Sequence, residues 1–285
     1  MSRDDHSYFL SRGFSANART ALQHYLYKDQ LDYLIHPKIP TNKEGLRVAE
    51  IGVGTSIWMI ELSRELSSTA QLDGLDVEFA QCPPKEWLAP NISWITHDIF
   101  SEPPAKLIEV YDVIHVQLFI TILRDGNPVP MLKNLMKMLR GYIQWGEWDF
   151  TTWEILRTKT APSEQNDELD QIRSYISTMG GTKANSGFLT IRYYPRAWIT
   201  NLHETFTEHG LRHVFVDRRR FDEQIVTLLL DTWIMAAQEL SSNVLDKLGG
   251  GKGDTMRGFI EQVRENRGNT AFNLDRVITI GQKPV

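Results

Sequence analysis

The sequence has little of several features that would point to particular classes of protein. Its 285 residues include one cysteine, Cys82, so the chain cannot form an internal disulfide. Lysine and arginine total 31 against 36 aspartates and glutamates, and a net charge of -5 argues against nucleic acid as the main partner. The first residues lack the apolar stretch of a secretory signal. We therefore expect a reduced, cytoplasmic protein that binds small molecules.

Long apolar runs are also missing. The most apolar window, 225–237, is interrupted by Asp231 and falls short of the about 20 residues that a bilayer requires. We expect a buried helix there and no membrane contact. The 41% of hydrophobic residues is enough for a sizeable core and excludes wholesale disorder. Three histidines, His203, His209 and His213, lack the spacing of a metal site, so no metal is expected.

Short apolar strands alternate with helical stretches through much of the chain. This alternation predicts a parallel sheet built from right-handed crossovers. Apolar spacing before the first strand predicts an additional helix at 15–27. The expected strands are 46–51, 72–76, 92–96, 112–117, 141–146, 211–216 and 276–280, with helices at 58–66, 129–139 and 196–209.

The other segments are expected to add helices around the core. Ligands of open α/β sheets bind at the carboxyl ends of the strands, so we interpret these additions as a lid over that edge. Inside the last insertion, the glycines of 249–253 predict a flexible connection between helices at 225–240 and 256–264. The expected division is a helical cap (1–44), a cofactor-binding core (45–150), an insertion (151–194) with a helix at 164–176, and the remaining core (195–285) with a helical insertion at 221–273.

The loop after the first strand is the most informative segment. Gly52 and Gly54 let the backbone turn sharply and approach a ligand closely. A dinucleotide fingerprint would continue to a third glycine where Ile57 stands, which weakens a pyrophosphate interpretation. No Gly-Lys-Ser/Thr follows, which excludes a P-loop. When this loop is considered alone, a purely structural turn would also explain its glycines.

Two carboxylates close the next two strands. Asp76 ends the second strand, where a carboxylate can accept both hydroxyls of a ribose. Asp98 follows the third strand, where it could accept from an adenine amine while an apolar side chain covers the ring. Either acid alone could be a helix cap or a loop residue. Together with the glycine turn, the two acids indicate adenosine without phosphates.

These motifs support a family resemblance that extends over most of the chain, through residues 8–13, 48–55, 72–76, 87–91, 111–115 and 141–147. In them the sequence resembles class I S-adenosylmethionine-dependent methyltransferases, and more closely the fungal secondary-metabolite branch with its gliotoxin-type amide N-methyltransferases and global-regulator-like methyltransferases. The resemblance implies an α/β fold, a Rossmann-like seven-stranded sheet with N-terminal helices and helical lid insertions.

The sequence departs from the family pattern at three places. Ser56 stands where a third glycine is usual, Glu78 replaces a small polar residue, and Leu139-Arg140-Gly141 replaces Pro-Gly-Gly. Ser56 is small enough to be tolerated and could cap the following helix.

The resemblance also implies the cofactor, S-adenosylmethionine, and the residues around it. The methionine half would lie on Glu50, Gly52 and Gly54, the ribose on Asp76, and the adenine on Asp98 and Ile99. The segment from His115 to Gln117 would form the floor beside the sulfonium. The expected cofactor-binding set is Glu50, Gly52, Gly54, Ser56, Asp76, Val77, Asp98, Ile99, Phe100, His115 and Gln117.

Methyl transfer needs a nucleophile aligned with the S–methyl bond and shielded from water, and a weak nucleophile also needs a base. At the ends of the fourth and fifth strands, His115 and Glu147 are our candidate catalytic residues, although each could equally be a hydrogen-bonded structural residue. The expected substrate pocket consists of Tyr8, Arg12, His24, Trp145 and Trp148.

The function predicted on this basis is methyl transfer to a nitrogen or oxygen of a small secondary metabolite, such as an amide or a peptide-derived product. One alternative is a cyclase or isomerase that keeps the methyltransferase fold. Another is a non-catalytic regulator that binds protein partners through its helical additions. The expected partner is a small-molecule substrate, and we expect the chain to bind neither nucleic acid nor a membrane. The sequence leaves open whether the chain forms a homodimer.

Overall fold

The computed structural model describes residues 10, 12–123, 126–159, 171 and 197–284. The expected pocket residue Tyr8 lies outside the described residues. So does nearly all of the helix expected at 164–176 and most of the 151–194 insertion.

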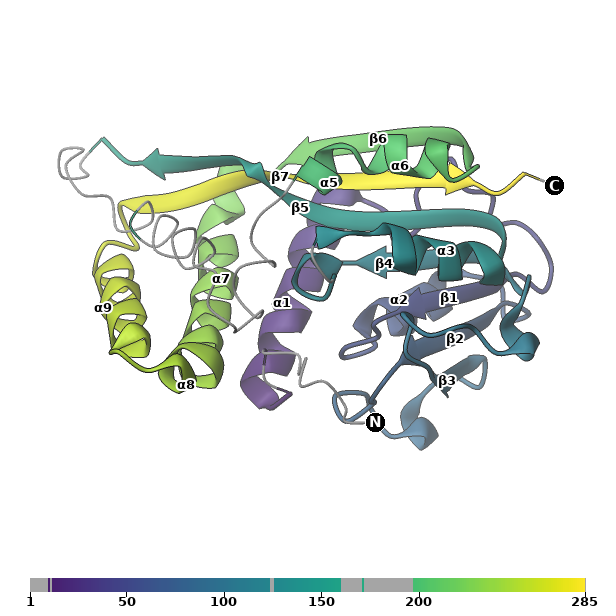
Figure 1. The fold of residues 1–285 in the computed structure, drawn as a ribbon, viewed down its shortest axis with the longest axis horizontal. Helices are drawn as coiled ribbons and strands as arrows, with labels where there is room; N and C mark the ends of the chain where they lie inside the picture. Colours follow the sequence, from purple (N-terminus) through teal and green to yellow (C-terminus); the bar gives the residue numbers. More distant parts are fainter. Residues whose placement is uncertain (1–9, 11, 124–125, 160–170, 172–196, 285) are drawn as a thin grey trace.

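A seven-stranded sheet with the order β3-β2-β1-β4-β5-β7-β6 forms the centre of the molecule (Figure 1). The first five strands pair in parallel, as expected from the strand–helix alternation. The strands are β1 (Arg47–Ile51), β2 (Gln71–Asp76), β3 (Ile92–Thr96), β4 (Tyr111–Gln117), β5 (Leu139–Arg157), β6 (Arg212–Arg220) and β7 (Thr270–Gln282).

The last strand, β7, corrects the expectation of a wholly parallel sheet, because it pairs antiparallel with both β5 and β6. The reason is the path of the chain after β6. The helices that follow stay beyond the carboxyl ends of the strands instead of crossing back, so β7 starts at that edge and runs in the opposite direction (Figure 1). β5 and β7 are also longer than expected, and their pairing continues past a register shift between Asp149 and Glu154.

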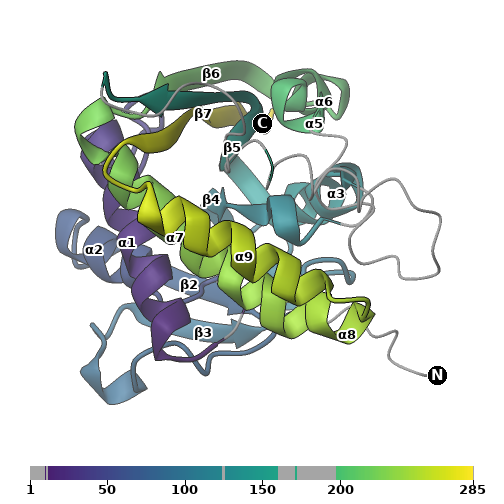
Figure 2. The same ribbon diagram turned by 90° about the vertical axis from the view of Figure 1, so that its left-hand side faces the viewer.

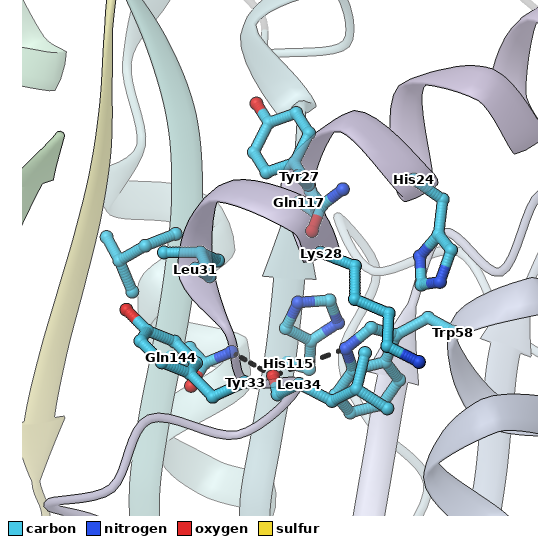
Figure 3. Close-up of a pocket in the computed structure, with 11 residues that line it drawn as sticks. His24, Tyr27, Lys28, Leu31, Tyr33, Leu34, Trp58, His115, Gln117 and Gln144 are labelled. Carbon is cyan, nitrogen blue, oxygen red and sulfur yellow. Dashed lines mark hydrogen bonds between the residues drawn. The ribbon is translucent and has the colours of Figure 1, made fainter. Parts of the chain in front are cut away.

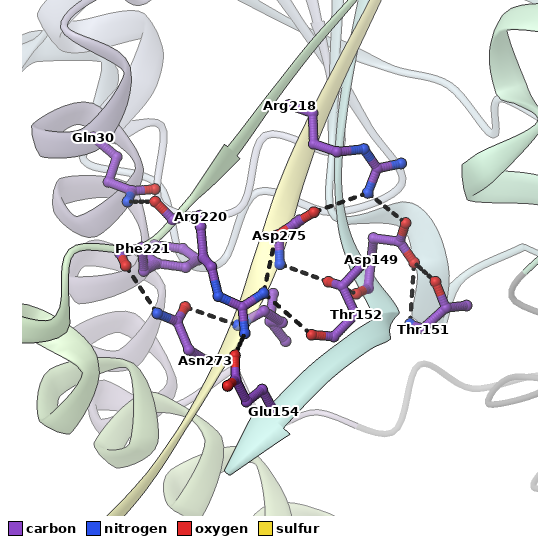
Figure 4. A network of polar contacts seen from close by, with 11 residues as sticks. Gln30, Asp149, Thr151, Thr152, Glu154, Arg218, Arg220, Phe221, Asn273 and Asp275 are labelled. Atoms are coloured by element: carbon purple, nitrogen blue, oxygen red, sulfur yellow. Dashed lines mark hydrogen bonds and ion pairs between the residues drawn. The ribbon is translucent and has the colours of Figure 1, made fainter. Parts of the chain in front are cut away.

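Charged side chains join the carboxyl ends of β5 and β6 to the start of β7 (Figure 4). The Arg218 guanidinium donates to Asp149 over 2.7 Å and to Asp275 over 3.2 Å. The Arg220 guanidinium binds Asp275 and Glu154. These arginines therefore hold the three strands together where the sheet extends toward the helices that follow β6.

Two long helices, α1 (Phe14–Leu31) and α7 (Val226–Leu240), pack against each other across the carboxyl edge of the sheet (Figure 2). None of the described helices is long and apolar enough to cross a membrane. The other helices are α2 (Ile57–Glu65), α3 (Val129–Met138), α5 (Ala197–Thr200), α6 (Leu202–Glu208), α8 (Asp246–Leu248) and α9 (Lys252–Glu265), with short turns η1 (Lys85–Trp87), η2 (Ala105–Leu107), η3 (Phe119–Thr121), η5 (Glu223–Ile225) and the π-helical η6 (Ser241–Leu245).

Two expectations about the helices need correction. The helix expected at 196–209 is interrupted at Asn201, which separates α5 from α6. The flexible connection expected at 249–253 ends earlier, because α9 already begins at Lys252. A Cβ on Gly253 would collide with the Asp246 carboxylate, so this glycine serves close packing of the helix and not a flexible turn.

Candidate functional site

The glycine turn connects β1 to α2 at the carboxyl edge. Gly52 and Gly54 have φ values of +73° and +54°, a backbone region that favours glycine. The Gly52 amide donates to the carbonyl of Leu75 on β2 over 2.9 Å. A Cβ at Gly52 would lie 2.7 Å from the ring of Phe119, which follows β4. Residues from β2 and from the segment after β4 thus pack closely against the turn.

Ser56 does not act as the side-chain cap that the sequence predicted. It precedes α2, but its φ is +64° and its side chain makes no capping hydrogen bond. A capping residue needs an extended backbone to aim its oxygen at the first free amides of the helix. The left-handed backbone here leaves Ser56 Oγ buried and without a partner among the described residues.

Asp76 ends β2 beside this turn. Its Oδ1 accepts from the amides of Val77 over 2.7 Å and Glu78 over 3.3 Å. Burial raises the pKa of Asp76, while nearby backbone amides, including that of Gly54, oppose this effect. The Glu78 side chain pairs with Arg12, which places this expected substrate residue at the same end of the sheet.

Past the next strand, the segment expected to hold adenine is partly open. Asp98 is exposed and its Oδ1 accepts from the Phe100 amide over 3.0 Å, which forms a local turn. The intervening Ile99 is buried, whereas Val77 is 56% exposed. β2 and β3 are paired neighbours, so these residues share one edge with Asp76.

Glu50 and His115 are register partners on β1 and β4. Glu50 Oε1 lies 3.9 Å from His115 Nδ1, which is too far for a hydrogen bond. Glu50 Oε2 and His115 Nδ1 are both buried with no partner in the described part of the chain. Burial raises the pKa of Glu50 well above its ordinary value and lowers the pKa of His115 to about 3. The imidazole is therefore neutral near pH 7.

A small cavity lies between α1 and the sheet (Figure 3). His24 and Tyr27 face it from α1, and His115 and Gln117 face it from β4. The His115 ring stacks on Trp58 with 3.9 Å between centroids. The structure thus brings the expected pocket residue His24 close to His115.

Glu147 and Trp145 do not join this cavity. Alternate residues of a strand point to opposite faces of a sheet, and Gln144 lines the cavity side. Trp145 is fully buried on the other face against Trp198 and Phe206. The structure therefore separates these two expected site residues from His115.

The Glu147 carboxylate is occupied by internal donors. Its Oε1 accepts from the Phe119 amide over 2.7 Å and from the Trp145 indole over 2.8 Å. Its Oε2 accepts from the Ile120 amide over 3.2 Å. Burial raises the pKa of Glu147 to about 8, against the effect of these donors. This arrangement suits a residue that positions the turn after β4.

Several residues at the site were missed from the sequence. Tyr27 and Lys28 follow His24 at helical spacing, so the period of α1 could have indicated that they share its face. Phe119 has no comparable signal, because only the packing of two loops brings it to Gly52. Among the described residues, no cluster of three or more histidine, cysteine, aspartate or glutamate side chains could hold a metal ion.

Comparison with known proteins links this arrangement to methyltransferases, although no protein-family model matches the chain. The chain is 30% identical over 183 residues to methyltransferase grgD of Penicillium sp, an alignment that covers 61% of this chain and 62% of that protein. It is 29% identical over 106 residues to N-methyltransferase tcpN of Claviceps purpurea, covering 37% and 38%. The chain thus spans less than two thirds of each of these relatives.

The fold is similar to that of a cyclopropane-fatty-acyl-phospholipid synthase-like protein from Lactobacillus casei, with a TM-score of 0.54, 14% identity, and 95% of this chain and 96% of that chain covered. The sheet order and the glycine turn beside strand-end acids define a class I methyltransferase fold. Within that class, the chain is similar in sequence to fungal methyltransferases. The family resemblance and the fold class predicted from the sequence are confirmed.

Proposed function

We propose that this chain binds S-adenosylmethionine at the carboxyl edge of β1, β2 and β4 and transfers its methyl group to a small molecule. The observation that carries this proposal is the pairing of the Gly52 turn with two acids, Glu50 and Asp76, at adjacent strand ends. The two fungal relatives named as methyltransferases support it.

The residues present fit the cofactor. Glu50 Oε2 is buried without a partner among the described residues, and a carboxyl in that position calls for a positively charged or hydrogen-bonding ligand such as an amino-acid ammonium. Asp76 would hold the ribose hydroxyls, and the apolar side chains of Val77 and Ile99 would cover the adenine. When bound, the cofactor would supply an electrophilic methyl group on its sulfonium.

The protein would contribute alignment and a shielded site. α1 lies across the strand ends, where its side chains help to exclude water from the cavity beside His115. Neutral His115 would orient the acceptor through a hydrogen bond rather than remove its proton. Glu147 would position the turn that presses Phe119 against Gly52. We propose a nitrogen or oxygen acceptor, and the name of the Claviceps relative favours nitrogen.

Binding is tested by isothermal titration of the protein with S-adenosylmethionine. Replacing Asp76 by asparagine should weaken binding at least tenfold, since the acceptor for two hydroxyls is impaired. Glu65→Gln, a change at a half-exposed position on α2, should leave binding unchanged. Failure of the unaltered protein to bind the cofactor would overturn the proposal.

Transfer is tested separately with methyl-labelled cofactor and a panel of small amines, amides and phenols. Label appearing in one of these compounds supports the proposed activity. Cofactor binding with conversion of a compound to a product of unchanged mass would instead show rearrangement and would overturn methyl transfer.

A further inference from the structure

A cluster of three side chains lies on the α1 face of the sheet, next to the cavity. Arg276 on β7 and Trp148 on β5 are register partners. Tyr27 of α1 lies against both, with its ring stacked on Trp148 at a centroid distance of 6.1 Å and the Arg276 Cζ 4.8 Å from its ring centroid. The proposed function assigns no role to this cluster.

Arg276 carries a positive charge that is only partly compensated inside the protein. Its side chain is completely buried, and Nη1 donates to the Tyr27 carbonyl over 2.8 Å. Burial lowers the pKa of Arg276 to about 10, so the group is still charged near pH 7. The neighbouring acid, Asp217, already accepts from Tyr33 and Arg219. A buried charge without a hydrogen-bonded counter-ion is costly, and a bound anion would offset that cost.

The free edge of the Arg276 guanidinium indicates which anion would fit. Its Nε and Nη2 are buried and have no partner among the described residues. Nε–H and one Nη2–H point in parallel along a single edge, the geometry with which arginine binds both oxygens of a carboxylate. Rings beside Arg276 explain its packing but leave these N–H groups unsatisfied.

The neighbours of Arg276 offer further donors. Tyr27 Oη and Trp148 Nε1 are also buried, and they interact with each other but make no hydrogen bond of normal geometry in the described ranges. Both side chains belong to the same stack as the guanidinium. Two unsatisfied guanidinium nitrogens, with a tyrosine hydroxyl and an indole N–H beside them, match a ligand that brings acceptor oxygens.

A ligand in the cavity could approach this cluster. Tyr27 lines the cavity together with Gln117, and its hydroxyl points away from His115 in Figure 3. Ile278, two residues after Arg276 on the same face of β7, lines the cavity as well. Tyr27 therefore connects the cavity to the cluster, whose other two members, Arg276 and Trp148, lie behind it and do not line the cavity.

We propose that Arg276, together with Tyr27 and Trp148, forms a carboxylate-binding subsite for the substrate. The substrate class is then a small carboxylic acid whose methyl-accepting atom lies toward His115. This inference rests on the proposed function, because that function places the acceptor in the cavity.

The test uses benzoate and benzamide, which have the same shape but differ in charge. Isothermal titration is carried out on the full chain saturated with S-adenosylhomocysteine, and the unaltered protein should bind benzoate at least tenfold more tightly than benzamide. Arg276→Lys keeps the charge but removes the two-pronged edge and should weaken benzoate binding about tenfold. Arg64→Lys, at an exposed arginine of α2, should have no effect.

Milder variants keep the test valid if Arg276→Lys does not fold. Tyr27→Phe and Trp148→Phe each remove one donor while retaining a ring, and each should weaken benzoate binding about threefold or more. Equal binding of benzoate and benzamide, or unchanged benzoate binding in both of these variants, would overturn the subsite. Titrating S-adenosylmethionine into the unaltered protein and into every variant separates the two proposals. Failure of the unaltered protein to bind the cofactor refutes the proposed function and not the subsite.

Discussion

The backbone amide of Phe119 donates to Glu147 Oε1 over 2.7 Å, while the ring of Phe119 occupies the space that a Cβ on Gly52 would need. Glu147 on β5 is thereby connected to the glycine turn after β1, although the two strands are not neighbours. Leu118, just before Phe119, has a φ of +57°, a conformation that costs free energy for a residue with a side chain. The Glu147 carboxyl holds this turn in place.

Replacing Glu147 by methionine should destabilise the protein. Methionine has a similar size but leaves the amides of Phe119 and Ile120 and the Trp145 indole without an acceptor. Because each buried unpaired donor costs about 1–3 kcal/mol, we expect a loss of at least 2 kcal/mol, measured by urea unfolding. Weaker S-adenosylmethionine binding should accompany it, since the turn beside Gly52 loses its support.

The matched variant Glu147→Gln separates positioning from proton transfer. Glutamine keeps the oxygen that accepts from Phe119 and Trp145, so most of the stability and cofactor affinity should remain. Glu204→Gln, at an exposed position on α6, is the control and should change stability by less than about 0.5 kcal/mol. A large fall in turnover by Glu147→Gln with unchanged cofactor binding would instead support the catalytic role predicted from the sequence.

The second prediction concerns Gly52. An alanine there would combine an unfavourable φ of +73° with a contact of 2.7 Å to the Phe119 ring. Gly45→Ala is the control, because its φ is +63° and a Cβ meets nothing within 4 Å. We expect Gly45→Ala to lose about 1 kcal/mol from backbone strain alone, and Gly52→Ala to lose more and to bind the cofactor poorly.

A double variant identifies the contact itself. In the double variant, Phe119→Leu replaces the ring that blocks the new methyl group of Gly52→Ala by a smaller side chain. Part of the stability lost in Gly52→Ala should therefore return. If the double variant is as unstable as the two single changes added together, the contact with Phe119 does not explain the need for glycine.

Most of the strands and helices of the fold could be predicted from local patterns in the sequence. The strands β1 to β4 and the helix α3 appear within a residue or two of the predicted ranges, because their apolar runs are short and sharply bounded. The direction of β7 was not predictable in this way. An apolar strand reads the same in either direction, and only the path of α7 to α9 determines where the chain re-enters the sheet.

The candidate site was predictable where a residue's role depends on its place at a strand end. Asp76 and His115 lie at the carboxyl edge for that reason. Glu147 follows the end of the strand expected at 141–146, but the observed β5 continues past it, so the alternation of side chains along the strand decides which face Glu147 lies on. The Arg276 cluster could not be foreseen, since its three members come from α1, β5 and β7 and meet only in the folded chain.

The third prediction is a stability maximum at mildly acidic pH, between about 4.5 and 6.5, where the following two effects cancel. The pKa of His115 is lowered to about 3, so between pH 3 and 6.5 the unfolded chain binds a proton that the folded chain does not, and stability falls as the pH drops through this window. The pKa of Glu147 is raised to about 8, so its contribution is lost as the pH rises from about 4.5 to 8.

Two variants assign these slopes. His115→Phe preserves a ring against Trp58 and should remove the loss of stability below about pH 4.5, where the His115 effect is not offset by Glu147, measured by urea unfolding at each pH. Glu147→Gln should flatten the slope between pH 6.5 and 8. Curves parallel to that of the unaltered protein in both windows would show that neither group titrates as described.

The last prediction concerns the attachment of α1 to α2. Glu61 accepts from His24 Nε2 over 3.0 Å and from Lys28 Nζ over 2.8 Å. Burial alone would raise the pKa of Glu61, but the donors Lys28 and His24 outweigh it and the pKa is lowered, so the carboxylate is charged at neutral pH. Glu61→Gln should cost about 1–2 kcal/mol, because a charged hydrogen bond is lost, and should speed hydrogen exchange at the amides of α1. Glu65→Gln on the same helix, with its carboxylate 4.0 Å from Lys28 Nζ, should do neither. If both variants exchange alike, the Glu61 contacts do not hold α1 over the strand ends, and its docking must come from the apolar packing against α7 instead.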